Sequence, residues 1–331
     1  MKKIFKKLYS LKQLNEIESY NLFQNIIHKK ISSIEISAAL VSIKMRSISI
    51  NEIIGAVKAF NKNMVFFKKP KYQFADIVGT GGDDINTINI STLSALLGSS
   101  LGLKIIKHCN KGVSSSLGSS DILKINNIKI HKSYKKIKNQ LDNNNVCFIY
   151  APNYHSGFQN VSKIRKQLNT RTIFNILGPL LNPSHPDLAV IGVYSKNLMK
   201  PISHIVRQLN YEKVMIINSD DIDEVTLHHY TNVIEINYDE ISSYRLYPED
   251  FGINKISNYY LKNNNIKKNC KIFNDICKGI GDIKYRYLIS INTAVLLNVF
   301  GYDDLQKNTK IAFQELNNGI IEKHIKKIQR V

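Results

Sequence analysis

The sequence contains few acidic residues, few cysteines and no long apolar run. Of its 331 residues, 26 are Asp or Glu and 46 are Lys or Arg, which gives a formal net charge of +20. No apolar stretch approaches the ~20 residues that a membrane-spanning helix needs. The basic segment Met1–Lys7 is not followed by the apolar run and small-residue cleavage site of a secretion signal. We therefore expect no membrane partner and no export.

The four cysteines show no spacing of the kind that binds a metal. They are Cys109, Cys147, Cys270 and Cys277. Nothing in the sequence suggests an oxidising compartment, and thiols in the cytosol are kept reduced. We expect free thiols and a cytoplasmic location.

The excess of positive charge raises the question of nucleic-acid binding. Its lysines are scattered along the whole chain, and isoleucine and asparagine are enriched as well. This pattern is typical of a mutational bias toward these residues, because a binding face would gather its charge in one place. No recognition motif or platform of aromatic residues accompanies the charge. A basic nucleic-acid-binding protein is one alternative, but we expect no specific nucleic-acid partner.

The first part of the chain is expected to be helical. Hydrophobic residues make up 43% of the sequence, which suffices for a core, and the length allows two domains. Within Met1–Met64, Ser32 and Glu35 form a capping-box pattern, and Ser49 and Glu52 repeat it before apolar residues at helical spacing. Because so small a bundle cannot bury all its apolar stripes, part of it is expected to pack on another domain or subunit.

From Gln73 onward, stretches typical of strands alternate with stretches typical of helices, which indicates a mostly parallel sheet covered by helices. We predict an α/β fold, with a small N-terminal helical domain at residues 1–68 and a larger α/β domain with a mostly parallel central sheet at residues 72–331. Helices from about 156–185 are expected to join the helical domain. The expected strands are Phe74–Val78, Leu103–Lys107, Val146–Tyr150, Leu188–Val193 and Val214–Ile217, followed by strand and turn at Tyr238–Phe251 and closing helices at Tyr287–Phe300 and Asp304–Lys326.

The first polar cluster follows the first expected strand, within DIVGTGGDDINTINISTLS at Asp76–Ser94. Its glycines allow several backbone N–H groups to approach one anion. Ser91 and Thr92 lie where a helix is expected to begin, and such an N-terminus attracts phosphate. The pattern is neither a P-loop nor G-x-G-x-x-G. The alternative is a plain strand-to-helix turn, but such a turn does not require the polar side chains of Asp83 and Asn89.

Three further polar clusters follow later strands. Lys107–Ser115 carries two lysines, serines and a glycine, which suit a second phosphate, and Ser119 opens a helix; a solvated basic loop is the alternative. Arg165 presents a planar fork that matches a carboxylate, although a surface cation is the commoner role. Asp223 and Glu224 are adjacent carboxylates, which favour a nearby cation such as Mg²⁺ over a simple polar loop.

These clusters resemble the motifs of anthranilate phosphoribosyltransferases. The four matching segments occur in the family's order, from Ser33 to about Thr226, and the resemblance is weaker beyond. They are Gly79–Asp83 with Asn89–Thr92 (GTGGD…NIST), Lys107–Ser115 (KHGNR-VSS), Ala151–His155 with Arg165–Pro183 (AP-x-YH and R-x-x-L-G-x-RT-x-FN-x-LGPL-x-NP), and the pair Asp223–Glu224. The departures are Asp84, Cys109, Asn169 and Ile222 in place of glycine, Ile88 in place of phenylalanine, Lys111 in place of arginine and Ser156–Phe158 in place of Pro-Ala-Met.

The resemblance implies a role for each matching residue. Phosphoribosyl diphosphate would be bound by Gly79, Gly82, Asp83, Thr87, Asn89, Ile90, Ser91, Thr92, Lys107, His108, Asn110, Lys111, Gly112, Val113, Ser114, Ser115 and Ser119. Anthranilate would be bound by Gly79, Asn110, His155, Arg165 and Gly178. Ser91, Asp223 and Glu224 would hold Mg²⁺, with two ions per subunit, and the helical domain would join two chains in a homodimer.

The implied reaction displaces diphosphate from C1 of phosphoribosyl diphosphate by the amine of anthranilate, a step of tryptophan biosynthesis. No side chain is needed as a nucleophile, so we expect catalysis to be electrostatic, with Lys107 at the leaving group and Arg165 at the acceptor. Domain closure about Lys68–Lys71 is expected to matter. A pyrimidine nucleoside phosphorylase is the main alternative because it shares the fold and a similar KHGN loop, but it uses phosphate and needs no acidic metal pair.

Overall fold

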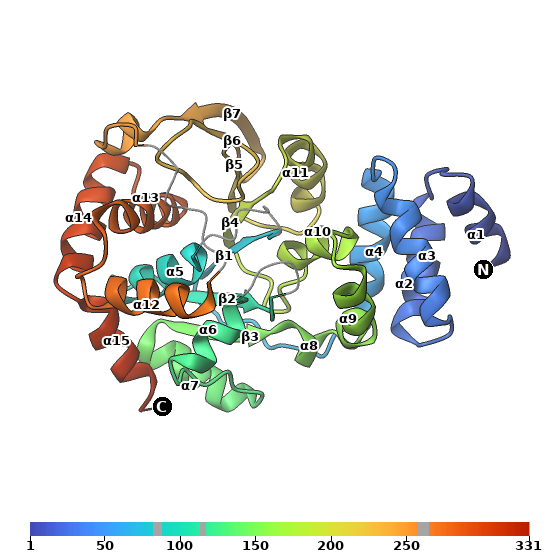
Figure 1. Ribbon diagram of the computed structural model, residues 1–331, viewed down its shortest axis with the longest axis horizontal. Coiled ribbons are helices and arrows are strands. Elements are labelled where there is room, and N and C mark those ends of the chain that lie inside the picture. Colours follow the sequence, from blue (N-terminus) through green and yellow to red (C-terminus); the bar gives the residue numbers. More distant parts are fainter. Residues whose placement is uncertain (82–87, 113–116, 257–264, 331) are drawn as a thin grey trace.

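The computed structural model describes residues 1–81, 88–112, 117–256 and 265–330 (Figure 1). Its N-terminal end is helical, as predicted, and consists of α1 (Lys2–Tyr9), α2 (Glu16–Ile27), α3 (Ser33–Lys44) and α4 (Ile50–Lys62). The two capping boxes predicted from the sequence are confirmed. The Ser32 hydroxyl accepts a hydrogen bond from the Glu35 N–H before α3, and the Ser49 hydroxyl accepts one from the Glu52 N–H before α4. In return, each Glu carboxylate accepts a hydrogen bond from the backbone N–H of its serine.

A seven-stranded sheet forms the centre of the rest of the chain, in the order β3-β2-β1-β4-β5-β6-β7. The first five strands along the sheet are parallel, and β6 and β7 are added antiparallel. The predicted α/β fold with a small helical domain and a mostly parallel sheet is therefore confirmed. The strands are β1 (Ala75–Gly79), β2 (Ile105–Cys109), β3 (Val146–Tyr150), β4 (Leu188–Gly192), β5 (Lys213–Asn218), β6 (Thr231–Asn237) and β7 (Glu240–Leu246).

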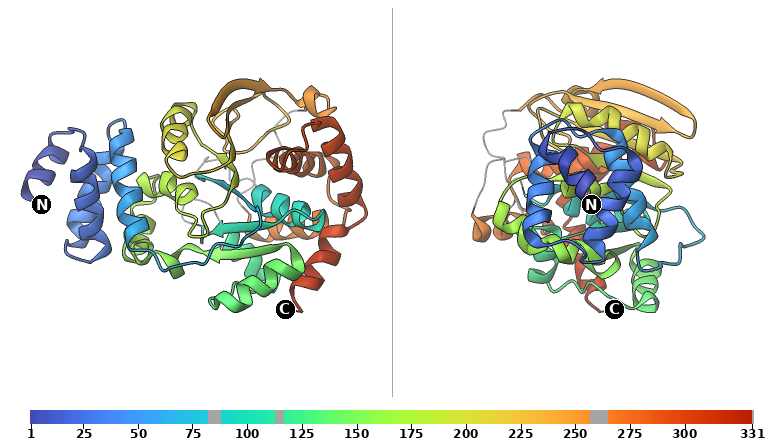
Figure 2. Two further views of the ribbon diagram at one scale, coloured as in Figure 1. Left: turned by 180° about the vertical axis from the view of Figure 1, so that it is seen from behind. Right: turned by 90° about the vertical axis from the view of Figure 1, so that its right-hand side faces the viewer.

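Helices cover both faces of the sheet (Figures 1 and 2). The C-terminal helices and α5 lie together on one face, and α10 and α11 lie on the other, toward α4. The helices after β1 are α5 (Ile90–Ser100), α6 (Ser119–Ile125), α7 (Tyr134–Asn144), α8 (Ala151–Tyr154), α9 (Ser156–Leu168), α10 (Ile173–Leu180), α11 (Met199–Arg207), α12 (Ile266–Cys277), α13 (Ile283–Val299), α14 (Leu305–Asn317) and α15 (Ile320–Ile328), with the 3-10 turns η1 (Lys196–Leu198) and η2 (Pro248–Phe251).

Alternate residues of each strand enter different cores, because successive side chains point to opposite faces. In β4, Leu188 and Val190 join the core under α5 and α13, whereas Ala189 and Ile191 join the core on the other side. That second core continues through α9, α10 and α11 into α2, α3 and α4. The apolar stripes of the small bundle are thus buried against later helices and one face of the sheet.

Several element boundaries differ from those expected. Strand β2 lies two residues further along than predicted, so that Lys107, His108 and Cys109 belong to the strand. The expected closing helix at Asp304–Lys326 is two helices, which Gly319 separates with a φ of +66°. Strand β6 was not expected. The division of the chain at residue 68, and the assignment of helices from about 156–185 to the helical domain, stay predictions.

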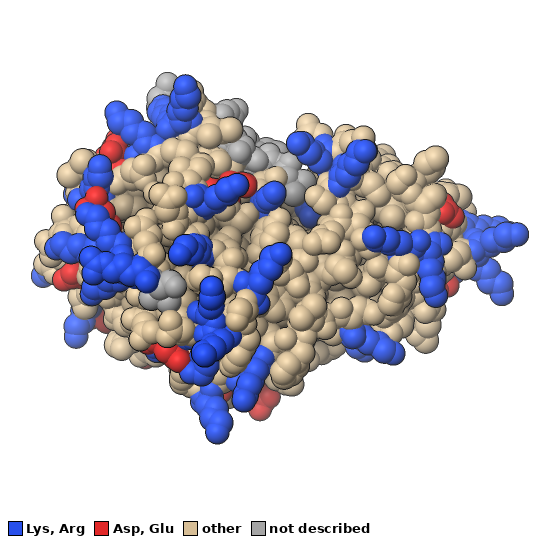
Figure 3. Space-filling view, turned by 90° about the horizontal axis from the view of Figure 1, so that it is seen from below, with Lys and Arg blue, Asp and Glu red and all other residues tan. Residues whose placement is uncertain are grey.

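Positive side chains are spread over the face of the molecule seen in Figure 3, from the helical end to the α/β end. This distribution agrees with the scatter of lysines along the sequence. Among the described helices, none is both long enough and apolar enough to cross a bilayer.

Candidate active site

A cavity of about 220 Å³ lies at the carboxyl ends of β1 and β2. Most of the predicted site residues line it. They are Gly79, Asn89, Ile90, Ser91, Lys107, His108, Asn110, Lys111, Gly112, Ser119, Arg165, Gly178, Asp223 and Glu224. Thr92 and His155 are buried outside this lining. Gly82, Asp83, Thr87, Val113, Ser114 and Ser115 lie outside the described residues.

Glycines let the acidic loop after β5 approach the end of β1. A Cβ on Gly79 would lie 2.3 Å from Asp223 Oδ2, and a Cβ on Gly192 would lie 1.7 Å from the Asp223 carbonyl oxygen. The N–H of Gly81, whose φ is +62°, donates to Asp223 Oδ2 over 2.6 Å. The predicted phosphate loop and the predicted metal pair are therefore in direct contact at this point.

The first turn of α5 supplies the phosphate-binding features predicted near NIST. Asn89 is the N-cap residue, and its side chain donates to the Leu117 carbonyl over 3.3 Å. Ile90 and Ser91 of the first turn line the cavity. Because the first N–H groups of a helix lack partners within the helix, this wall favours an anion.

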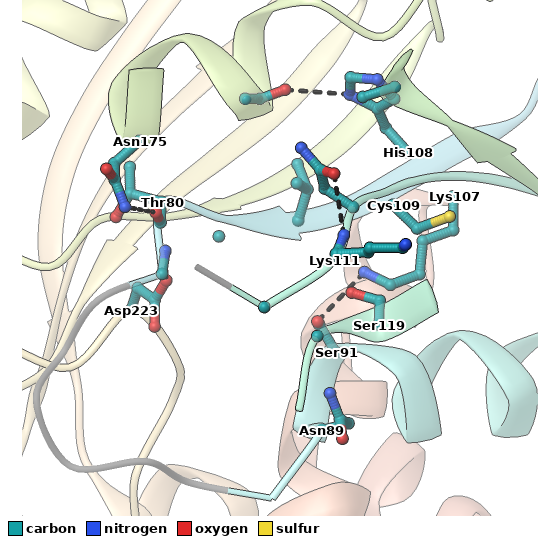
Figure 4. Close-up of a pocket in the computed structure, with 18 of the residues that line it drawn as sticks. Thr80, Asn89, Ser91, Lys107, His108, Cys109, Lys111, Ser119, Asn175 and Asp223 are labelled. Carbon is teal, nitrogen blue, oxygen red and sulfur yellow. Dashed lines mark hydrogen bonds between the residues drawn. The ribbon is translucent and has the colours of Figure 1, made fainter. Parts of the chain in front are cut away.

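The loop after β2 is anchored to the start of α6. Asp121 accepts from Gly112 N over 3.1 Å and from Gly118 N over 2.9 Å. A Cβ on Gly118 would lie 2.1 Å from Gly112 N, so glycine is required for this approach. Lys111 N donates to its neighbour Asn110 Oδ1 (Figure 4). Asp121 was not predicted, although its capping position three residues after Gly118 is a signal for it.

Lys107 is buried beneath the cavity. Its ammonium group donates to the Ile77 carbonyl and, over 3.1 Å, to Ser91 Oγ. Burial lowers the pKa of Lys107, and the carboxylates of Asp76, Glu224 and Asp223 oppose this shift. Since an ammonium group has three donors, one is left to meet a ligand oxygen.

Asp76 is a site residue that the sequence reasoning missed. It accepts from Asn182 Nδ2 over 2.8 Å and from His108 N over 3.3 Å. Burial raises its pKa to about 6, while the charge of Lys107 acts in the opposite direction. An acidic residue inside an otherwise apolar strand was the available signal.

His108 is held as a neutral imidazole. Its Nδ1 lies 3.0 Å from the Gly178 carbonyl, which can only accept, so Nδ1 carries the proton. Burial, with a smaller contribution from His155, lowers the pKa of His108 to about 3. His108 therefore contributes no positive charge to the cavity.

Arg165 forms the opposite end of the site. Its Nη2 donates to Asn175 Oδ1 over 3.2 Å, and its guanidinium lies 5.5 Å from the centre of the Phe174 ring. Burial alone lowers its pKa to about 10. No carboxylate among the described residues offsets that cost, which is the state of a cation that awaits an anionic ligand.

Asn175 and the aromatic residues near Arg165 were not predicted as site residues. Asn175 Nδ2 donates to the Thr80 carbonyl over 3.3 Å, which connects Arg165 to the end of β1. Phe158 and Phe174 line the cavity, and their ring centres are 5.6 Å apart. His155 lies behind Phe158, at 5.9 Å between ring centres. The apolar spacing of these residues is indistinguishable from that of a core helix.

The carboxylates of Asp223 and Glu224 both line the cavity and are mostly buried. Burial raises the pKa of Asp223, while the N–H of Gly81 and the charges of Lys107 and Arg171 lower it. In Figure 4, Asp223 lies with Thr80 and Asn175 on one side of the cavity, and Ser91 lies with Lys107 and Ser119 on the other. Within the described residues, no third His, Cys, Asp or Glu completes a metal cluster with this pair.

The departures from the family pattern fit the local backbone. Asn169 ends α9 with a φ of +43°, a left-handed conformation that asparagine tolerates better than most residues. Ile222 and Ile88 are buried in the core around α5 and α13. Cys109 is buried at the cavity wall, where burial raises its pKa to about 12 and keeps the thiol protonated. Asp84 lies outside the described residues.

Comparison with known proteins matches both parts of the chain to domains of one family. A model described as the helical bundle domain of a glycosyl transferase family matches residues 2–64, and that of the family's a/b domain matches residues 71–321. A curated protein named anthranilate phosphoribosyltransferase, from Buchnera aphidicola subsp. Acyrthosiphon pisum (strain Tuc7), is 48% identical over 99% of this chain and 96% of its own length. A second protein of the same name, from Buchnera aphidicola subsp. Schizaphis graminum (strain Sg), is 46% identical over 100% of this chain and 99% of its own length.

Solved structures agree over nearly the whole chain. Anthranilate phosphoribosyltransferase from Saccharomyces cerevisiae, in complex with PRPP and Mg, superposes with a TM-score of 0.86 at 27% identity and covers 99% of this chain and 96% of that chain. The same enzyme with 4-fluoroanthranilate gives a TM-score of 0.83. The enzyme from Thermus thermophilus has the same fold, with a TM-score of 0.86 at 24% identity and 99% coverage of both chains.

Replacing His108 by Asn is expected to reduce the loss of stability in acid. A free histidine binds its proton near pH 6.5, whereas His108 in the folded chain binds it near pH 3. The contribution of the neutral imidazole to the free energy of unfolding is therefore fully present above about pH 6.5 and is lost as the pH falls toward 3. Between pH 7 and pH 5 this loss amounts to about 2 kcal/mol. Urea unfolding at the two pH values measures it, with the exposed His204→Asn as control. Equal losses in the wild type and His108→Asn would contradict the assignment.

Proposed function

The chain belongs to the family of anthranilate phosphoribosyltransferases, and we propose that its cavity transfers the phosphoribosyl group of phosphoribosyl diphosphate to anthranilate. The products are N-(5-phosphoribosyl)anthranilate and diphosphate, in tryptophan biosynthesis. The observation that carries the proposal is the division of one cavity into two unlike ends. A helix N-terminus and a buried lysine form the first end, and a buried arginine beside aromatic rings forms the second. A nucleoside phosphorylase would have no use for the acidic pair between them.

Phosphoribosyl diphosphate is assigned to the end formed by β1, α5 and the loop after β2. Ser91, in the first turn of α5, opens onto this end, and Lys107, which already donates to its hydroxyl, would direct its remaining donor to a diphosphate oxygen. Asn110, Lys111 and Gly112 close the same side. The S. cerevisiae relative, whose structure contains PRPP and Mg, supports this choice of substrate.

Anthranilate is assigned to the end formed by α9 and α10. The uncompensated cation of Arg165 would accept its carboxylate, and Phe158 and Phe174 would contact its ring. Asn175 holds the guanidinium in place from the far side. The structure of the S. cerevisiae relative with 4-fluoroanthranilate supports an acceptor of this shape.

The donor set at the middle of the cavity fits Mg²⁺. Asp223 and Glu224 provide carboxylate oxygens in a buried position, and Mg²⁺ is commonly held by one or two carboxylates together with substrate phosphates. When bound, the ion would supply positive charge beside the leaving diphosphate. Because Ser91 lies across the cavity from Asp223 in Figure 4, it would contact a different ion, which supports two ions per subunit.

The protein's own contribution to the reaction is positional and electrostatic. A bond forms between the amine nitrogen of anthranilate and C1 of the ribose while the bond from C1 to the diphosphate oxygen breaks. Negative charge grows on the diphosphate, where Lys107 and the start of α5 face it. Arg165 holds the amine toward C1 through the carboxylate. We also propose that closure of the helical bundle about Lys68–Lys71 brings these ends together.

The exposed face of α3 supports a homodimer through the helical domain. Ile34, Val41 and Met45 recur along one side of the helix and are 81%, 39% and 68% exposed. A location in the cytoplasm belongs to the same proposal and is supported by the four free cysteines.

Changing Ile34 to Glu is expected to dissociate the dimer. The side chain makes little contact within its own chain, and an acidic residue is tolerated in the first turn of a helix. A buried unpaired carboxylate would weaken the interface at least about tenfold. Analytical ultracentrifugation measures this, with Ile266→Glu on α12 as control because Ile266 is also an exposed isoleucine. A wild type that sediments as a monomer would refute the proposal.

Arg165→Ala is expected to impair the use of anthranilate far more than the binding of phosphoribosyl diphosphate. A lost charge-assisted contact to a carboxylate costs about 1.5–3 kcal/mol, which corresponds to about a 10- to 100-fold loss in affinity. Steady-state kinetics for each substrate measure the two effects. The control is Arg207→Ala on α11, an exposed arginine outside the cavity lining. Equal weakening for both substrates would argue against the assignment.

Replacing Asp223 and Glu224 together by Asn and Gln is expected to separate stability from activity. The two mostly buried carboxylates repel each other, and Asp76 would still offset the charge of Lys107, so the double variant should melt no lower than the wild type without metal. Its turnover should fall about 10²–10³-fold because the leaving group loses a cation, and added Mg²⁺ should restore part of it. Melting temperature and Mg²⁺-dependent turnover are measured on the same preparation. A lower melting temperature with near-normal turnover per folded molecule would show a structural pair instead.

A further inference from the structure

A second cavity, of about 630 Å³, lies on the other side of α10 from the candidate active site. We call it the α10 cavity. It is bounded by the end of α3 with the loop that follows, by the start of α10, and by the segment from β4 to α11. The residues on which the argument depends are Ile43, Lys44, Ile48, Arg171, Ile176 and Tyr194.

The walls of the α10 cavity combine apolar and polar side chains, and the apolar ones come from several elements. Ile43 and Ile48 approach from the helical end, Ile176 from α10, and Leu198 from η1. Tyr194 adds an aromatic face, with the Arg171 guanidinium 4.5 Å from the centre of its ring. A concave site of about 300–1,000 Å³ with apolar walls and a few polar groups is typical of small-molecule binding.

The charges around the α10 cavity are of one sign. Lys44, Arg46 and Arg171 line it, and no Asp or Glu is among the described residues that do. Arg46 is neutralised by Glu52, which accepts from two of its nitrogens. Lys44 is exposed, and its ammonium group donates to the hydroxyl of Thr170. Lys44 therefore places positive charge at the mouth of the cavity, on the helical side where Ile43 and Ile48 also lie.

We propose that the α10 cavity binds a small organic anion with a flat apolar body, of the aromatic carboxylate class. The anionic group would lie near Lys44, whose positive charge attracts it at the mouth of the cavity. The flat body would contact Tyr194 and the isoleucines. This assignment does not depend on the phosphoribosyl transfer proposed above.

An occupant of the α10 cavity would contact elements that also shape the candidate active site. Phe174, Asn175 and Gly178 of α10 line the first cavity, whereas Ile173 and Ile176 line the second. Tyr194 N donates to Thr80 Oγ1 over 3.0 Å, and Thr80 lines the first cavity. The occupant would also touch both the helical end and the α/β end, and so restrain one against the other.

The absence of tryptophan from the chain allows a direct test of binding. Tyr194→Trp places a single tryptophan in the cavity wall and keeps an aromatic ring there. The probe is 8-anilinonaphthalene-1-sulfonate, a fluorescent aromatic anion. We expect saturable quenching of the tryptophan emission at one probe per chain. Tyr302→Trp, at an exposed tyrosine between α13 and α14, is the matched control and should show no saturable quenching.

The charge requirement is tested in the Tyr194→Trp protein. Lys44→Glu should weaken binding at least about tenfold, as loss of a charge-assisted contact does. Lys310→Glu changes the net charge equally from an exposed position on α14, at the far end of the molecule in Figure 1, and should leave the affinity within about twofold. Equal weakening by both variants, or by neither, would overturn the proposal. Cooperative melting confirms that each variant is folded. If the Tyr194→Trp protein is not folded, Ile48→Trp, on the opposite wall of the cavity, replaces it as the fluorescent reporter.

Competition identifies the class of ligand. Benzoate should displace the probe, and inorganic phosphate at equal concentration should not. Displacement by phosphate alone would show a simple anion site and contradict the proposed class. An affinity for the probe that falls as the protein concentration rises would show that a second copy of the chain fills the cavity instead, and would equally refute it.

Discussion

A lysine ammonium group buried at the end of β2 is the constraint around which the active-site half of the molecule is arranged. Removing such a charge from water is costly unless other groups replace the water. Here the Ile77 carbonyl and the Ser91 hydroxyl accept hydrogen bonds from Lys107, and Asp76, Glu224 and Asp223 supply negative charge. These groups come from three segments of the chain: β1, the start of α5 and the loop after β5. The position of Lys107 therefore depends on the sheet as a whole.

The parallel sheet explains how these segments meet. Strands β1, β2 and β5 end at the same edge of the sheet, and residues that follow each of them line one cavity. Asp223, on the loop after β5, can enter that space only because Gly79 and Gly192 leave room for it. A side chain at either position would push the carboxylate away from Lys107. The glycines and the lysine thus belong to one electrostatic arrangement, although each looks like a separate motif in the sequence.

Features with a local cause could be predicted from the sequence, and features that depend on distant partners could not. The capping boxes before α3 and α4 join residues three positions apart, so their pattern is visible in a few letters. The end of β2 was misplaced because His108 and Cys109 begin a polar stretch that is typical of a loop, and only their pairing with β3 makes them part of a strand. Asp76 and Asn175 were missed because each lies in an apolar element. They matter only through contacts made in three dimensions, with His108 and Arg165 respectively.

The two buried cations of the site differ in a way that assigns their roles. Lys107 is surrounded by carboxylates of the protein, so its charge is largely balanced before any substrate arrives. Arg165 has an amide oxygen and an aromatic ring as neighbours, and burial alone shifts its pKa. A ligand carboxylate at Arg165 would remove an existing energetic cost, whereas a ligand at Lys107 must compete with the carboxylates already there. Arg165 is therefore suited to select an acceptor in the ground state. Lys107 is suited to respond when negative charge on the leaving diphosphate grows during the reaction.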